Sequence, residues 1–162
     1  MGFFNFKSLM DIVTFFMPDI HPVDTVTKDD IIKAFERSNI TINAKSYILC
    51  VDRHYACITR HDLREYIKKS GVAGCTYEKE EFDCDNFAAA SYGLGAMWYA
   101  TKHKDDPVGG PPIGMIVSGN HMFNFGLVKE KKEDELYIYL YEPQNNNHKK
   151  FAEPAYARIV II

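Results

Sequence analysis

Three side chains of this sequence have the chemistry of a nucleophile, a base and an orienting acid: Cys84, His121 and Glu142. Cys84 stands where an acidic stretch changes into an alanine-rich segment, and the amide groups and dipole of a helix N-terminus stabilise a thiolate. A thiolate nucleophile needs a base, and the base needs an acceptor that fixes its tautomer. The combination predicts attack on an amide bond, although each residue alone also has an ordinary structural explanation.

His121 and Glu142 meet only if the segments around them pair as a hairpin. A turn within residues 129–135 folds the chain about a point near residue 132 and places the partner of His121 near position 143, with Glu142 inside a margin of one residue. Directly opposed residues have Cβ atoms about 4.5–5.5 Å apart, so a carboxylate there can accept a hydrogen bond from the imidazole. A slip of one residue would place the two on opposite faces. Asn124 is the alternative for the third role.

Helices are indicated by periodicity and by capping residues. Thr27 and Thr59 each have the form of a helix N-cap. The most strongly helical segment, residues 88–99, directly follows Cys84. Apolar side chains also recur at helical spacing in the first third of the chain, at Leu9, Ile12, Val13 and Phe16 and again at Ile31, Ile32 and Phe35.

Strand-like segments dominate the second half. They follow the Gly-Gly-Pro-Pro run at 109–112 and cover residues 113–117, 122–128, 136–141 and 156–162, with one earlier run at 47–51. The order predicts an α+β fold with N-terminal helices, including a central helix that bears Cys84, and a C-terminal antiparallel sheet. We expect one domain over residues 1–162, with 1–45 as a helical N-terminal extension and 46–162 as the core.

Composition bounds the class of protein. The chain has 162 residues, 46% of them hydrophobic, which is enough for one packed core. Its 19 Lys and Arg against 22 Asp and Glu give a net charge of −3, which disfavours nucleic acid as a partner. No apolar run reaches the roughly 20 residues of a membrane span, and no secretory signal is recognised, so we expect no membrane contact and a cytoplasmic location. The oligomeric state stays open.

The four cysteines, Cys50, Cys57, Cys75 and Cys84, are interpreted as free thiols. The chain is long and rich in core residues for a disulfide scaffold. It has no Cys-x-x-Cys pair and no histidine at zinc-finger spacing, which argues against a structural zinc site. Each cysteine is therefore explained by packing or by chemistry.

Three motifs carry a resemblance to a known family. They are Phe-Asp-Cys-Asp-Asn-Phe-Ala at 82–88, Gly-Asn-His-Met-Phe-Asn at 119–124 and Tyr-Glu-Pro-Gln at 141–144. They resemble the papain-like cysteine protease domain of mushroom agglutinin-type lectins and its short bacterial and phage relatives, over about residues 46–147. The resemblance implies a papain-like fold with Cys84 as nucleophile, His121 as general base and Glu142 as orienting acid.

The expected function is therefore that of a cysteine peptidase or amidase, which cleaves a protein or peptide through a thioester on Cys84. One alternative is a peptidoglycan amidase or endopeptidase of the NlpC or CHAP type, because an Asp-Cys-Asp motif followed by a histidine on a strand also resembles those enzymes. Another is a catalytically inert interaction module of the same fold.

The position of the glutamine departs from the family pattern. Papain-like enzymes carry a glutamine shortly before the cysteine, whereas the only glutamine here is Gln144. The backbone of Cys84 would then share the oxyanion hole with Asn43 or Tyr77.

Acidic residues surround Cys84, at Asp83, Asp85, Glu80 and Glu81. Their oxygens suit a divalent cation, and cation dependence is also implied by the resemblance, so we expect calcium to bind there while the chemistry itself needs no cofactor. Acids ahead of a helix also complement its dipole without any metal.

Overall fold

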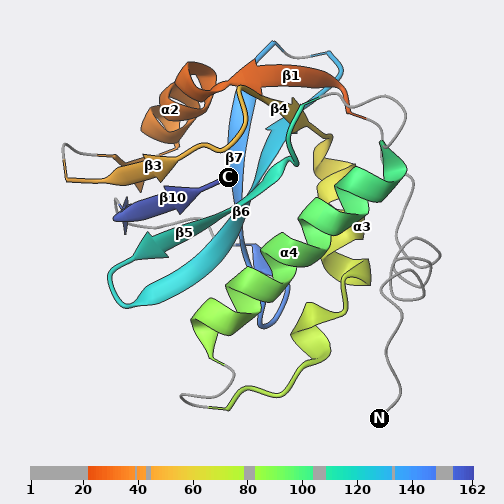
Figure 1. The fold of residues 1–162 in the computed structure, drawn as a ribbon, viewed down its shortest axis with the longest axis vertical. Helices are drawn as coiled ribbons and strands as arrows, with labels where there is room; N and C mark the ends of the chain where they lie inside the picture. Colours follow the sequence, from red (N-terminus) through yellow and green to blue (C-terminus); the bar gives the residue numbers. More distant parts are fainter. Residues whose placement is uncertain are drawn as a thin grey trace.

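The computed structural model describes residues 22–38, 40–42, 45–78, 83–103, 109–132, 134–148 and 155–162. Its helices in these ranges are α2 (Lys28–Arg37), α3 (Arg60–Lys69), α4 (Cys84–Lys102) and a short 3-10 turn at Val72–Gly74. The strands are β1 (Asp24–Thr27), β2 (Ile40–Thr41), β3 (Tyr47–Leu49), β4 (His54–Cys57), β5 (Ile113–Ser118), β6 (His121–Lys129), β7 (Leu136–Glu142), β8 (Asn147–His148), β9 (Ala155–Tyr156) and β10 (Ile159–Ile161). The predicted α+β class is confirmed (Figure 1).

The main sheet has six strands in the order β3-β10-β5-β6-β7-β8. Its neighbours are antiparallel except β10 and β3, which run parallel. β1 and β4 form a small antiparallel sheet, and β2 and β9 form a small parallel one. The last strand in sequence therefore lies inside the main sheet, between β3 and β5.

The helix starts follow the capping rules. The Thr27 hydroxyl accepts a hydrogen bond from the backbone N–H of Asp30, and the Asp30 carboxylate accepts one from the backbone N–H of Thr27. Thr59 caps α3 in the same way through the N–H of Asp62. Both N-caps were predicted from sequence, because a cap depends on residues only two or three positions away.

The segment before residue 45 is not purely helical, which corrects the prediction. The first apolar series, Leu9 to Phe16, lies outside the described residues, but residues 24–27 and 40–41 are strands. Residues 24–57 also contribute to the core of the sheet: Phe35 of α2 packs edge-to-face against Phe125 of β6, with ring centroids 5.1 Å apart. This segment and the sheet therefore share one core.

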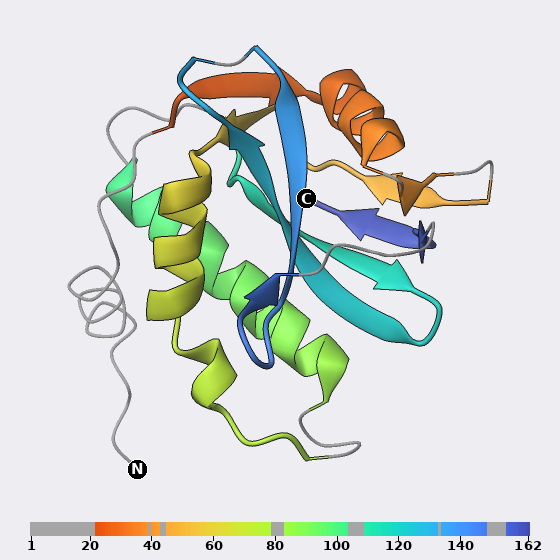
Figure 2. The ribbon, with the colours of Figure 1, turned by 180° about the vertical axis from the view of Figure 1, so that it is seen from behind.

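Helices cover the two faces of the sheet. α2 lies on the face that carries Phe125 and Leu140, whereas α3 and α4 pack through Tyr66 and Trp98 on the face that carries Tyr141. Figures 1 and 2 show α3 and α4 side by side on one flank of the sheet and α2 apart from them. The N-terminus of α4 points along the sheet towards the β5–β6 turn.

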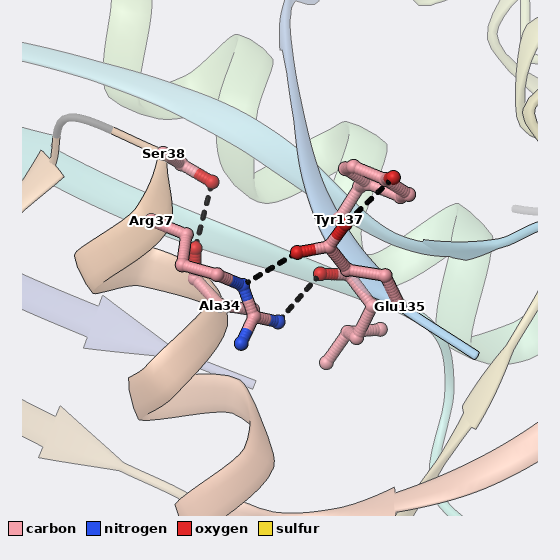
Figure 3. A network of polar contacts seen from close by, with 6 residues as sticks. Ala34, Arg37, Ser38, Glu135 and Tyr137 are labelled. Atoms are coloured by element: carbon pink, nitrogen blue, oxygen red, sulfur yellow. Dashed lines mark hydrogen bonds and ion pairs between the residues drawn. The ribbon is translucent and has the colours of Figure 1, made fainter. Parts of the chain in front are cut away.

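Polar contacts fix α2 to the start of β7 (Figure 3). The Arg37 guanidinium donates to the carbonyl of Leu136 at 3.1 Å and pairs with the Glu135 carboxylate at 3.2 Å. The Tyr137 hydroxyl donates to the same carboxylate at 2.9 Å. α2 is thus held on the sheet both by its apolar face and by its C-terminal arginine.

Candidate functional site

Cys84 is the first residue of α4, at the place expected from the sequence. Asp83 precedes the helix, and its backbone N–H donates to the side-chain oxygen of Asn86 at 3.3 Å. The side chain of Asp85 accepts from the N–H of Asn86 at 2.9 Å, so local polar groups satisfy the first turn. The thiol of Cys84 is half-buried, and the structure has all four cysteines as free thiols, as predicted.

His121 and Glu142 form the predicted contact. His121 Nε2 lies 2.6 Å from Glu142 Oε2, and the Glu142 side chain is only 5% exposed whereas that of His121 is 35% exposed. The imidazole also stacks on Phe123, with ring centroids 5.9 Å apart. The pair therefore consists of a buried carboxylate whose histidine partner faces solvent on one side.

The turn before His121 is tight. Gly119 has a φ of +61°, and Asn120 has no positive φ, as in a type II′ hairpin turn, where the first central residue must tolerate the left-handed region. Ser118 pairs with His121 across this turn. The glycine thus fixes where the histidine enters the sheet.

The register of β6 and β7 differs from the predicted one by one residue. Asn124 pairs with Tyr141, so Glu142 extends the ladder opposite Phe123 and stands diagonally from His121. Diagonal neighbours on one face are about 7–8 Å apart at Cα, within reach of long side chains. The contact forms because the two residues still share a face.

Cys84 is not joined to this pair. Within the described ranges no hydrogen bond links its thiol to His121. The residue that connects α4 to β6 is Asn124, whose side-chain N–H groups donate to the carbonyls of Ala88 at 3.0 Å and Gly114 at 3.2 Å. Asn124 is completely buried, and its side chain ties the helix to the sheet.

A chain of buried polar groups lies near Asn124 and was not predicted from the sequence. The Tyr66 hydroxyl donates to the carbonyl of Ser91, and the Ser91 hydroxyl shares a hydrogen bond of 2.9 Å with the Tyr141 hydroxyl. Burial raises the pKa of both tyrosines above its ordinary value. No local sequence pattern predicts these hydrogen bonds, because Tyr66, Ser91 and Tyr141 lie on three different elements, α3, α4 and β7.

The predicted calcium site stays a prediction, because two of its four acidic residues lie outside the described residues. Glu80 and Glu81 lie outside the described residues, and in the ranges that the structure describes no group of three His, Cys, Asp or Glu side chains could hold a metal ion. A hydrogen bond between Asp83 and Asp85 lowers the pKa of Asp85. Of the predicted oxyanion donors, Asn43 lies outside the described residues and Tyr77 is exposed.

A hollow of about 510 Å³ opens where the chain segments 45–47 and 156–159 run side by side. Ile159 of β10 pairs with Tyr47 on one side and with Val117 on the other, so these three side chains form one row across the sheet. Tyr47 is 75% exposed and Tyr156 is 60% exposed. The remaining lining is Lys45, Ser46, Ala157 and Arg158. We call this hollow the tyrosine groove.

A second hollow of about 290 Å³ lies between α2, β1 and the β6–β7 turn. Two of its cations are already paired: Lys129 with Asp24, and Arg37 with Glu135. In the tyrosine groove, by contrast, the guanidinium of Arg158 makes no ion pair with any described residue. The tyrosine groove is therefore the stronger candidate for a ligand site.

Two of the solved structures that are similar to this chain are structures of a mushroom lectin. One is described as a PSL1a–E64 complex, with a TM-score of 0.66 and 21% identity over 85% of this chain and 51% of the other. The second is the Polyporus squamosus lectin bound to the human-type influenza-binding epitope Neu5Acα2-6Galβ1-4GlcNAc, with a TM-score of 0.65 and 18% identity over 85% of this chain and 49% of the other. No family model and no curated protein matches.

These likenesses establish a shared fold, and the chain spans about half the length of the lectin structures it matches. They support the resemblance to mushroom agglutinin-type lectins at the level of the fold, without confirming a papain-like protease domain. Among the described residues, no helix is long and apolar enough to cross a bilayer.

The prediction of a cysteine hydrolase is wrong according to this comparison. Both neighbours are structures of a lectin, and this finding contradicts the expected peptidase, thiol protease and catalytic triad. The findings favour the alternative of an inert interaction module with this fold.

Proposed function

We propose that this chain is a carbohydrate-binding module and that its ligand lies in the tyrosine groove. The observation that carries the proposal is the pair of exposed rings, Tyr47 and Tyr156, beside a hollow that also holds polar side chains. An aromatic ring offers an apolar face that suits the C–H face of a sugar, while its hydroxyl group can still hydrogen-bond. Ligand sites typically combine such surfaces with a few placed polar groups.

The fold likeness adds support, because the Polyporus squamosus lectin is described with a bound glycan. A carbohydrate or peptidoglycan partner is consistent with the proposal.

The test is calorimetric titration of the chain with oligosaccharides that end in galactose, N-acetylglucosamine or N-acetylneuraminic acid. We expect Tyr47→Ala and Tyr156→Ala each to weaken binding about tenfold or more, as for loss of an aromatic contact. Tyr77→Ala is the matched control, because Tyr77 is 54% exposed and does not line the groove. Equal weakening by all three variants, or no binding of any glycan, would refute the proposal.

The residues Cys84, His121 and Glu142 remain a proposal of their own, as a second, polar binding site. Its support is the 2.6 Å contact between His121 and Glu142 and the position of Cys84 at the start of α4. E64, which is named in the PSL1a structure, is the probe. We expect intact mass and calorimetry to detect E64 on the chain and on Cys75→Ser, but not on Cys84→Ser.

A further inference from the structure

The charge of the tyrosine groove narrows the class of glycan. Among the described residues, its lining includes Lys45 and Arg158 and no aspartate or glutamate, although the whole chain carries a net charge of −3. A basic hollow on an acidic chain favours an anionic ligand.

Arg158 is the better anchor of the two cations. It is exposed, it lies between Tyr156 and Ile159 on the segment that forms one wall, and its guanidinium has no ion pair with a described residue. Its backbone is fixed, because its N–H donates to the carbonyl of Val117 at 2.8 Å and its carbonyl accepts from the N–H of Tyr47 at 2.9 Å. The Cα of Arg158, from which its side chain extends, is therefore held in a defined position between two strands.

We infer that the groove selects sugars that carry a carboxylate, and that Arg158 binds this carboxylate while Tyr47 and Tyr156 flank the ring. A guanidinium presents parallel N–H donors that match both oxygens of a carboxylate, whereas an ammonium acts as a single point charge. Sialic, uronic and muramic acids share this group, and the experiment distinguishes them. The inference rests on the proposed carbohydrate-binding function and deepens it.

The experiment compares acidic sugars with their neutral counterparts. Lactose is titrated against 6′-sialyllactose, N-acetylglucosamine against N-acetylmuramic acid, and a glucose disaccharide against its glucuronic acid analogue. We expect at least one acidic sugar to bind about tenfold more tightly than its neutral partner, as for a hydrogen bond to a charged group. The preference should shrink as salt is raised from 0.05 to 0.5 M, because the groove is open to solvent.

Variants assign the effect to a residue. We expect Arg158→Gln to abolish the preference while neutral sugars still bind, Arg158→Lys to restore only part of it, and Arg53→Gln, at an exposed position outside the groove, to change nothing. Equal binding of acidic and neutral sugars would overturn this inference and leave the carbohydrate-binding proposal standing. Binding that no substitution of Tyr47 or Tyr156 weakens, or an absence of binding, would overturn both.

Discussion

The contact between His121 and Glu142 places a carboxylate that is 5% exposed beside an imidazole that faces solvent. Removing a carboxylate from water is costly unless it is hydrogen-bonded. The histidine therefore contributes to stability whatever ligand the chain binds, by sharing a hydrogen bond with Glu142.

We accordingly expect His121→Ala to lower the free energy of unfolding by about 1–3 kcal/mol, because a buried acceptor loses a partner. Urea denaturation at neutral pH measures this loss. His54→Ala is the control, since His54 is an exposed histidine on β4. Equal losses in the two variants would show that the contact with Glu142 contributes nothing.

The cysteines should differ in reactivity. Burial raises the pKa of the Cys57 thiol to about 12 and also raises that of Cys50, whereas Cys75 is exposed. Because the thiolate is the reactive form, we expect iodoacetamide to label Cys75 and the half-buried Cys84 before Cys50 and Cys57 at neutral pH. Peptide mass spectrometry after short labelling times measures the order in which the cysteines react. Early labelling of Cys57 in the folded chain would contradict the described packing.

Among the elements, β1 is tied to β6 by the ion pair of Asp24 with Lys129. The hydrogen bond from Lys129, followed by one from the Thr25 N–H, lowers the pKa of Asp24 below 3.8. A carboxyl group whose pKa is lowered on folding stabilises the protein above its unfolded pKa, and this contribution disappears as the pH falls through the folded pKa.

Asp24→Asn should therefore reduce the melting temperature at pH 6 and have a progressively smaller effect as the pH falls below about 3.8. Thermal unfolding of both chains across pH 2–6 measures the difference. Asp29→Asn serves as the control on an exposed helix start. A difference between Asp24→Asn and the unaltered chain that stays constant down to pH 2 would exclude this linkage.

Two glycines show how closely the elements approach. A Cβ at Gly114 of β5 would lie 2.6 Å from the carbonyl oxygen of Ile161 and 2.3 Å from the Phe125 ring, whereas a Cβ at Gly93 of α4 would meet nothing within 4 Å. We expect Gly114→Ala to destabilise the fold by about 1–3 kcal/mol through overpacking. Gly93→Ala should stabilise it by about 0.5–1 kcal/mol, because alanine loses less backbone entropy in a helix. The denaturation midpoints of the two variants measure these changes. Changes in stability of the same sign for Gly114→Ala and Gly93→Ala would contradict the described packing.

For the whole molecule, residues 24–57 and the later strands share one core, and we propose that they unfold as one domain. Phe35→Ala should then lower the free energy of unfolding by about 3–5 kcal/mol, because it removes the ring that packs on Phe125. The loss should appear in one cooperative transition, followed by both far-UV and near-UV circular dichroism. Two separate transitions would show that the early segment folds independently.

The sequence predicted what depends on close neighbours. Thr27 and Thr59 were identified because an N-cap is local, and His121 and Glu142 because a hairpin joins residues only 21 positions apart. The β1–β4 pair and the tyrosine groove were missed, because the groove combines residues 45–47 with 156–159. The motif around Cys84 located a helix start correctly, but residue types could not show whether its thiol reaches the histidine.

The place of β10 has a consequence for the order in which the chain can fold. Among the described strands, β3 joins the main sheet only through β10, which follows every other strand of that sheet in the sequence. While the ribosome has not yet released residues 159–161, β3 has no neighbour and the edge of β5 stays open. Such open edges are sites of aggregation. This protein should therefore depend on holding chaperones during synthesis more than a fold whose sheet grows strand by strand.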